Sequence, residues 1–202
     1  MIKVKELVVG GSLNLIKSKN PDFDEEKMAV IKYGLEGLYL TISKTIIIFL
    51  IAAILGILKE LIILTIIYNI LRTPSFGMHA SKSWICFVGS SLTFLGGAYL
   101  CTLVTIPVNV KVIVGIIGII LIFKNSPADT AKRPIVSPTR RMVFKIISTV
   151  IAISFVILSI MIPNDFWANC FILSLIIQCF MTAPTIYKLF GQSYDNYKKY
   201  VN

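Results

Sequence analysis

The stretch WICFVGSSLTFLGGAYLCTLVTI, residues 84–106, decides the fold class of this chain. It carries no charged side chain, it stops at Pro107, and it exceeds the ~20 residues that a helix needs to cross a bilayer. The whole chain shares this character, because 56% of its 202 residues are hydrophobic and its mean hydropathy is +0.82. Soluble domains are less apolar than this. We therefore predict an all-α integral membrane protein.

Further apolar runs flank this stretch and predict about six transmembrane helices in a single domain, residues 1–202. The runs are, in chain order, a helix that starts within 20–26 and ends by Leu58, then Leu61–Leu71, 84–106, 108–123, 146–162 and about 166–182. Leu61–Leu71 is the weakest, because at helical rise it covers only ~16 Å of the ~30 Å hydrocarbon layer. We expect it to be tilted or incomplete, or to borrow length from its neighbours.

The amino-terminal region, residues 1–36, is predicted to be a cytoplasmic amphipathic and helical segment. Apolar residues recur at three- and four-residue spacing among the lysines of residues 1–19, which indicates a helix lying on the membrane surface. Gly10 and Gly11 weaken this prediction by roughly 1 kcal/mol each, and a plain tail is the alternative.

The formal charge of +10 indicates which side of the membrane the loops occupy. In a soluble protein it would suggest nucleic acid, but cytoplasmic loops of membrane proteins collect Lys and Arg. The loop 124–145 holds six such residues, so we predict that it is cytoplasmic. Counting spans puts residues 72–83 and the polar tail from Tyr187 on the same side. The predicted partner of this surface is therefore a lipid bilayer and not nucleic acid.

The polar interruption RTPSFGMHASKSWIC, residues 72–86, is where chemistry is expected. It holds the only histidine, His79, and Cys86 follows seven residues later at the start of an apolar run. A cysteine in the first turn of a helix meets free backbone N–H groups and the positive end of the helix dipole, which favour the reactive thiolate. A Cys–His pair is the minimum machinery for acyl transfer through a thioester.

Neighbouring residues extend this candidate site. Ser81 or Ser83 is placed to cap the helix, while Lys82 and Arg72 add positive potential on the same side. An ordinary interpretation stands beside this one, in which the histidine is an interfacial residue and the cysteine packs as a small hydrophobe. In that case Arg72 anchors the chain at the level of the lipid headgroups.

The spacing of His79 and Cys86 restricts the geometry. In one straight helix the two side chains would lie ~10.5 Å apart along the axis, whereas a base must approach to about 3 Å. The chain must therefore bend between them, and Pro74 and Gly77 favour irregular backbone just before His79. We predict a looped His79 folded back over the mouth of the helix.

No metal and no cofactor is predicted, because one histidine, no HExxH motif and cysteines without CxxC spacing offer no ligand set. A rival function is a non-catalytic helical bundle that exports or scaffolds a hydrophobic peptide. That function favours several ionisable side chains lining a path through the membrane. The apolar runs of this chain contain few of them.

The pattern of the polar interruption resembles that of the accessory gene regulator protein B family, the membrane cysteine endopeptidases of Gram-positive quorum sensing. The family motif is Arg, then Gly-x-His, then Cys before a membrane helix, and Arg72, Gly77, His79 and Cys86 match it. Chain length, number of spans and the basic central loop agree in outline. The chain departs at Phe76, where many members carry a small residue, and in a central loop with only Lys-Arg and Arg-Arg pairs.

The resemblance implies a reaction and its partners. The substrate would be an autoinducer pro-peptide with an amphipathic leader, a central signal segment and an acidic tail. Cys86 would attack the carbonyl between signal and tail, with His79 as base and then acid, and a Cys or Ser of the signal would close a thiolactone or lactone ring. The predicted residues that bind substrate or order the loop are Arg72, Gly77, Lys82 and Ser83. A homodimer in the cell membrane, with its active site on the cytoplasmic side, is also implied.

Overall fold

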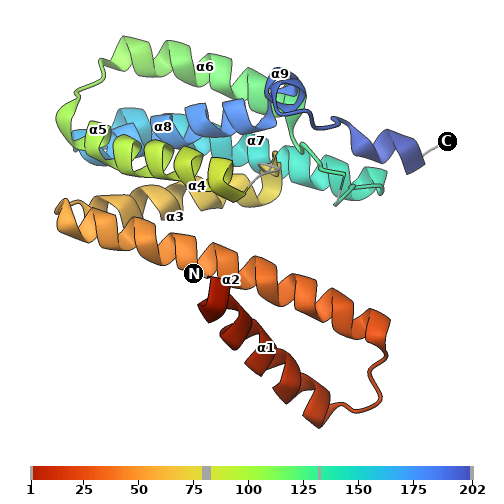
Figure 1. Ribbon diagram of the computed structural model, residues 1–202. Helices are drawn as coiled ribbons and strands as arrows, with labels where there is room; N and C mark the ends of the chain where they lie inside the picture. Colours follow the sequence, from red (N-terminus) through yellow and green to blue (C-terminus); the bar gives the residue numbers. More distant parts are fainter. Residues whose placement is uncertain (1, 79–82, 132, 201–202) are drawn as a thin grey trace. The chain divides into compact units, whose positions relative to one another are not determined.

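The computed structural model describes residues 2–78, 83–131 and 133–200, and for residues 2–4 and 83 it describes the backbone only. All regular elements within these ranges are helices, which confirms the predicted all-α class (Figure 1). The α-helices are α1 (Ile2–Lys19), α2 (Glu25–Ile54), α3 (Leu58–Ser75), α4 (Ser83–Ser91), α5 (Gly97–Leu103), α6 (Val108–Asn125), α7 (Pro138–Met161), α8 (Asp165–Thr182) and α9 (Pro184–Leu189). A π-helical turn, Leu92–Gly96, joins α4 to α5, and a 3₁₀ helix spans Asn196–Tyr200.

Five stretches of helix within the described residues are long and apolar enough to cross a membrane. They are Glu25–Ile54, Trp84–Leu103, Val108–Asn125, Pro138–Met161 and Asp165–Thr182. The expected sixth, α3, is not among them, although it is longer than the predicted run Leu61–Leu71. Lys59 and Glu60 lie in its first turn rather than interrupting a span, and the helix measures about 27 Å at the standard rise. Because of the charged residues near its two ends, α3 is not among the helices that are apolar enough to cross a membrane.

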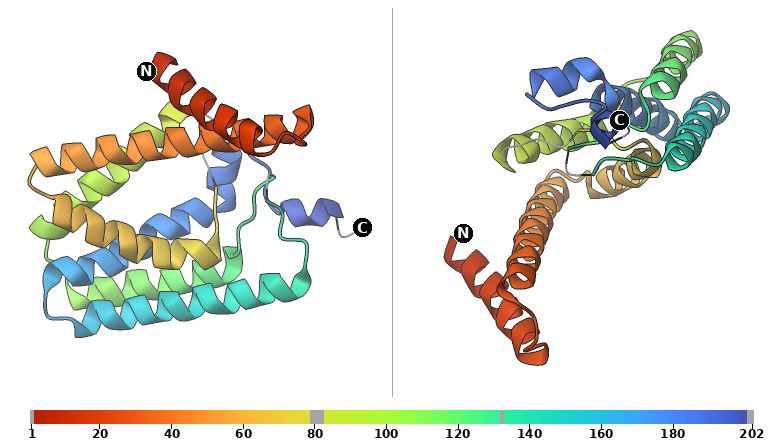
Figure 2. Two further views of the ribbon diagram at one scale, coloured as in Figure 1. Left: turned by 90° about the horizontal axis from the view of Figure 1, so that it is seen from below. Right: turned by 90° about the vertical axis from the view of Figure 1, so that its right-hand side faces the viewer.

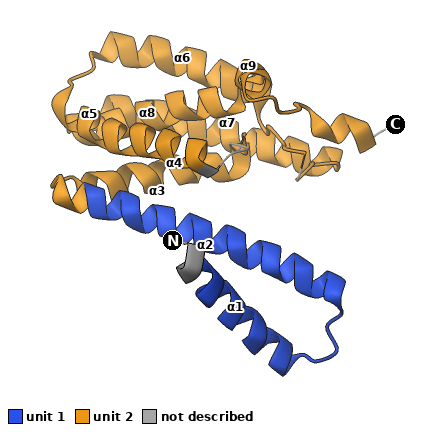
Figure 3. Ribbon diagram, in the orientation of Figure 1, with its two compact units in different colours: residues 1–51 blue, residues 52–202 orange. Residues whose placement is uncertain are grey.

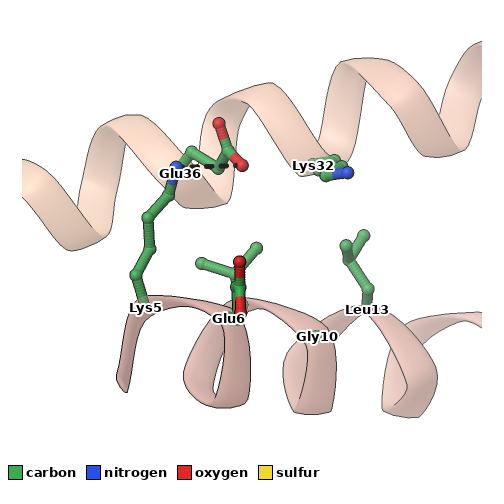
Figure 4. Close-up of a pocket in the computed structure, with 7 residues that line it drawn as sticks. Lys5, Glu6, Gly10, Leu13, Lys32 and Glu36 are labelled. Carbon is green, nitrogen blue, oxygen red and sulfur yellow. Dashed lines mark ion pairs between the residues drawn. The ribbon is translucent and has the colours of Figure 1, made fainter. Parts of the chain in front are cut away.

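The chain divides into two compact units, residues 1–51 and 52–202 (Figure 3). In the first unit α1 confirms the helix predicted for residues 1–19 and continues through Gly10 and Gly11. Lys5 of α1 reaches across to Glu36 of α2 in a 3.2 Å ion pair, beside a groove of about 340 Å³ between the two helices (Figure 4). The prediction that the whole chain is one peptidase domain stays a prediction.

In the second unit α8 is the central helix, and α3, α5, α6 and α7 pack around it (Figures 1 and 2). In α8, 61% of the residues are buried, against at most 28% of the apolar 18-residue stretches in the other four candidate spans. Close packing depends on Gly118 of α6, because a Cβ at this position would lie 2.7 Å from Cδ2 of Leu175 in α8. The polar side chains of α8 that are buried in this interior are Asn169, Ser174, Gln178 and Thr182.

One end of the second unit gathers the segments that the charge pattern placed on one side of the membrane. The end of α3, the α6–α7 connection, the end of α8 and the tail meet there (Figure 2). The predicted loop 124–145 is shorter in the structure, because α6 runs to Asn125 and α7 begins at Pro138. The tail is more than a polar extension, since the side chain of Tyr187 is completely buried.

Candidate functional site

Cys86 lies in the first turn of α4, which begins at Ser83, as the sequence predicted. Its side chain is exposed, whereas the other three cysteines, Cys101, Cys170 and Cys179, are buried, and all four are free thiols. Of Ser83, the predicted cap, the structure describes the backbone alone. His79 and Lys82 lie outside the described residues, as does the predicted bend between His79 and Cys86.

The backbone that leads toward His79 leaves the helical conformation abruptly. Phe76 has φ +58° and ψ −138°, and Gly77 has φ +120°. The irregular backbone predicted just before the histidine is therefore confirmed for these two residues. Pro74 does not cause the break, because α3 continues through it to Ser75. A non-glycine residue at positive φ costs on the order of 1–3 kcal/mol, so surrounding contacts must hold Phe76 in place.

Arg72, in the last turn of α3, holds this irregular turn with three hydrogen bonds. Its guanidinium donates to the carbonyl oxygens of Phe76 at 2.8 Å, Gly77 at 3.2 Å and Met78 at 2.8 Å. A planar group with five N–H donors suits such a set of acceptors better than an ammonium group. A Cβ at Gly77 would lie 2.3 Å from Nη1 of Arg72 and 2.7 Å from the carbonyl oxygen of Met181. Position 77 thus requires glycine for both its φ and its space.

Three residues that the sequence did not suggest hold the same turn from other elements. The N–H of Gly77 donates to the carbonyl of Ala128 in the α6–α7 loop at 2.9 Å. The N–H of Met78 donates to the carbonyl of Met181 at the end of α8, also at 2.9 Å. Gln178, fully buried in α8, donates from Nε2 to the carbonyl of Phe76 at 2.7 Å. The only signal in the sequence was a lone glutamine within an apolar run.

Phe76, the residue that departs from the family motif, has a packing role in this chain. Its ring lies edge-on to that of Phe144 in α7, with the ring centres 5.1 Å apart. Beside this pair is an open groove of about 370 Å³. It is lined by Phe76, Phe144, residues 133–137 and Arg140, so it presents two arginines, Arg133 and Arg140, next to the turn that leads to His79.

These features define a class: a multi-pass helical membrane protein with an exposed cysteine in a helix's first turn and a strained, fully anchored turn before its histidine. Residues 12–182 match the family described as Accessory gene regulator B. The chain belongs to this family.

Individual relatives agree with this assignment. The chain is 30% identical to an AgrB-like protein of Clostridium acetobutylicum over 99% of its own length and 93% of the relative's. It is 30% identical to an AgrB-like protein of Listeria monocytogenes, over 88% and 87% of the two chains. It is 24% identical to accessory gene regulator protein B of Staphylococcus aureus, over 84% and 89%. No solved structure matches the chain.

Proposed function

We propose that this protein is a membrane cysteine endopeptidase that removes the carboxy-terminal tail of an autoinducer pro-peptide through a thioester. The observation that carries the proposal is the exposed Cys86 thiol in the first turn of α4, four residues beyond the segment 79–82 and close in sequence to the anchored turn at residues 76–78. Membership of the accessory gene regulator B family supports a role with a pro-peptide.

The proposed chemistry runs in two steps. The thiolate of Cys86 attacks the carbonyl carbon between signal and tail, after His79 has taken the thiol proton. The C–N bond breaks, His79 protonates the leaving amine, and the acyl group remains on sulfur as a thioester. A thiol or hydroxyl of the signal segment then attacks the thioester, releasing Cys86 and closing a thiolactone or lactone ring. A site where water is scarce favours this internal nucleophile over hydrolysis.

The anchored turn and the neighbouring groove fit this reaction. Arg72 and Gly77 would act by fixing the backbone from which His79 continues, rather than by touching substrate. The groove beside Phe76 offers Arg133 and Arg140 to an acidic peptide, and opposite charges there would speed encounter and fix register. We place this end of the protein on the cytoplasmic side, because it carries the basic residues.

The test is cleavage of the cognate pro-peptide by the protein in membranes. Cys86→Ala and His79→Ala should each abolish cleavage, while Cys101→Ala, which changes a buried thiol, serves as the matched control and should retain it. A thioester intermediate should be trapped by hydroxylamine only when Cys86 is present. Normal processing by the Cys86→Ala protein would overturn the proposal and favour the non-catalytic exporter or scaffold.

A further inference from the structure

The carboxylate of Asp129, in the α6–α7 loop, is buried with its side chain only 1% exposed. Its Oδ1 accepts the backbone N–H of Asn196 at 2.9 Å. Its Oδ2 accepts the N–H of Tyr197 at 2.9 Å and that of Ile135 at 3.2 Å. A buried carboxylate is tolerated only where donors replace the lost water, and two of these three donors come from the tail. Asp129 therefore depends on the tail for two of its three backbone hydrogen bonds.

Side chains also hold the tail against α7 and α9. Nη1 of Arg141 lies 3.5 Å from Oδ2 of Asp129, and the guanidinium sits 3.4 Å above the ring of Tyr197. The rings of Tyr187 and Tyr194 pack edge-on with their centres 5.1 Å apart. Arg141, one of the six basic residues of the predicted loop 124–145, thus contacts the protein itself. The tail beyond α9 is a packed part of the second unit.

Ala128, the residue before Asp129, joins this arrangement to the turn that leads to His79. Its carbonyl oxygen accepts both the N–H of Gly77 at 2.9 Å and the hydroxyl of Tyr187 at 3.0 Å. Its own N–H donates to the carbonyl of Ser75 at 3.0 Å. The backbone on both sides of Phe76 is therefore hydrogen-bonded to Ala128, and the tail holds the next residue, Asp129.

We propose that the tail, docked through Asn196 and Tyr197 on the Asp129 carboxylate, holds residues 75–78 in position, so that Asp129 is a positioning residue for the reaction. If the tail leaves, the carboxylate loses two donors and must regain water, which opens the loop. Ala128 then moves with it, and residues 75–78 lose their bonds to the loop. The role assigned to residues 75–78 in the reaction rests on the proposed peptidase function, whereas the mechanical link between the tail and these residues does not.

Two variants and a matched control test the link. Asp129→Asn keeps the shape but puts an NH₂ group against backbone donors. Tyr197→Ala removes the ring under Arg141 and serves as the milder variant should the first fail to insert. Asp195→Asn is the control, because it makes the same chemical change in the same tail at a carboxylate whose ion pair, at 2.7 Å, is with the exposed Lys198. Asparagine also tolerates the φ of +53° at position 195.

Each full-length variant, in lipid vesicles, is measured by amide hydrogen exchange and by pro-peptide cleavage. Asp129→Asn should speed exchange across residues 75–78 and lower kcat by about 10- to 100-fold with little change in KM, since small displacements of a catalytic group cost on that order. Tyr197→Ala should do the same to a smaller extent, and Asp195→Asn should do neither.

Two outcomes would overturn the proposal. In the first, Asp129→Asn and Tyr197→Ala speed exchange only within the tail and leave residues 75–78 as protected as before. In the second, residues 75–78 exchange faster but kcat is unchanged, so their order does not serve the reaction. Absence of cleavage by the unaltered protein would instead defeat the proposed peptidase function, and the exchange data would still decide the link.

Discussion

Nε2 of Gln178 donates to the carbonyl oxygen of Phe76 at 2.7 Å, joining the core of α8 to a turn 102 residues earlier in the chain. Gln178 is fully buried, and its Oε1 has no hydrogen-bond partner among the described residues. A buried amide with one unmet acceptor is a cost to stability. The glutamine is therefore better explained by its hold on the strained residue Phe76 than by packing.

Replacing Gln178 by leucine should reduce pro-peptide cleavage more than it reduces stability. The change loses one hydrogen bond, worth about 1 kcal/mol, but it also removes the unmet acceptor, so the melting temperature should shift little. Cleavage should fall about tenfold, because the carbonyl of Phe76 then depends on Arg72 alone. Ser174→Ala is the control, since Ser174 is fully buried one turn earlier in α8 and its hydroxyl has no partner in the described structure. Equal cleavage by both variants would contradict this role.

Gly77→Ala should disable the protein where another glycine substitution does not. The new Cβ would meet Arg72 and the Met181 carbonyl within 2.7 Å at a φ of +120°, a conformation that costs alanine on the order of 1–3 kcal/mol before the clash is counted. Gly89→Ala in α4 is the control, because among the described residues no atom outside the neighbouring backbone of α4 lies within 4 Å of its Cβ position, and alanine favours a helix by up to about 1 kcal/mol. Cleavage rates and thermal unfolding of the two variants decide the matter, and an active Gly77→Ala protein would show that the turn is not needed.

Local features of this site were predictable from the sequence, and long-range ones were not. The placement of Cys86 in a first turn followed from a polar segment meeting an apolar run, and the irregular backbone at Gly77 followed from residue type. The hydrogen bonds of Gln178 and Asp129 could not be predicted from the sequence. Periodicity shows which face of a helix is apolar, but it does not show which residues of a distant element contact that face. The length of α3 was underestimated for a related reason: hydropathy excludes charged end turns that are nonetheless helical.

Cys86 should be the one cysteine of the folded protein that a membrane-impermeant maleimide labels, and only from the cytoplasmic face. The other three thiols are at most 8% exposed, so they should react only after denaturation. The reagent is added outside inverted or right-side-out vesicles that carry either the unaltered protein or the Cys86→Ser variant. The mass of the protein then shows from which face Cys86 has been labelled. Labelling of Cys86 from the outside would reverse the orientation that the basic residues predict.

The docking of the tail should weaken at strongly alkaline pH. Burial, together with the nearby charge of Asp195, raises the pKa of Tyr194 to about 12, and burial also raises the pKa of Tyr187 above its ordinary value of 10.0. Both hydroxyls stay protonated longer in the folded protein than in the unfolded chain. Their contribution to stability is therefore complete below pH 10 and is lost as the pH rises toward 12.

Tyrosinate absorbance and thermal unfolding, followed together across this pH range, check the expectation. The folded protein should show a late titration step near pH 12 that shrinks in Tyr194→Phe, and the melting temperature should fall over the same interval. The fall should be smaller in Tyr194→Phe, because phenylalanine keeps the ring contact with Tyr187 but has no proton to lose. A single titration step near pH 10 in the folded protein would mean that these hydroxyls are open to water and that the tail is not docked as described.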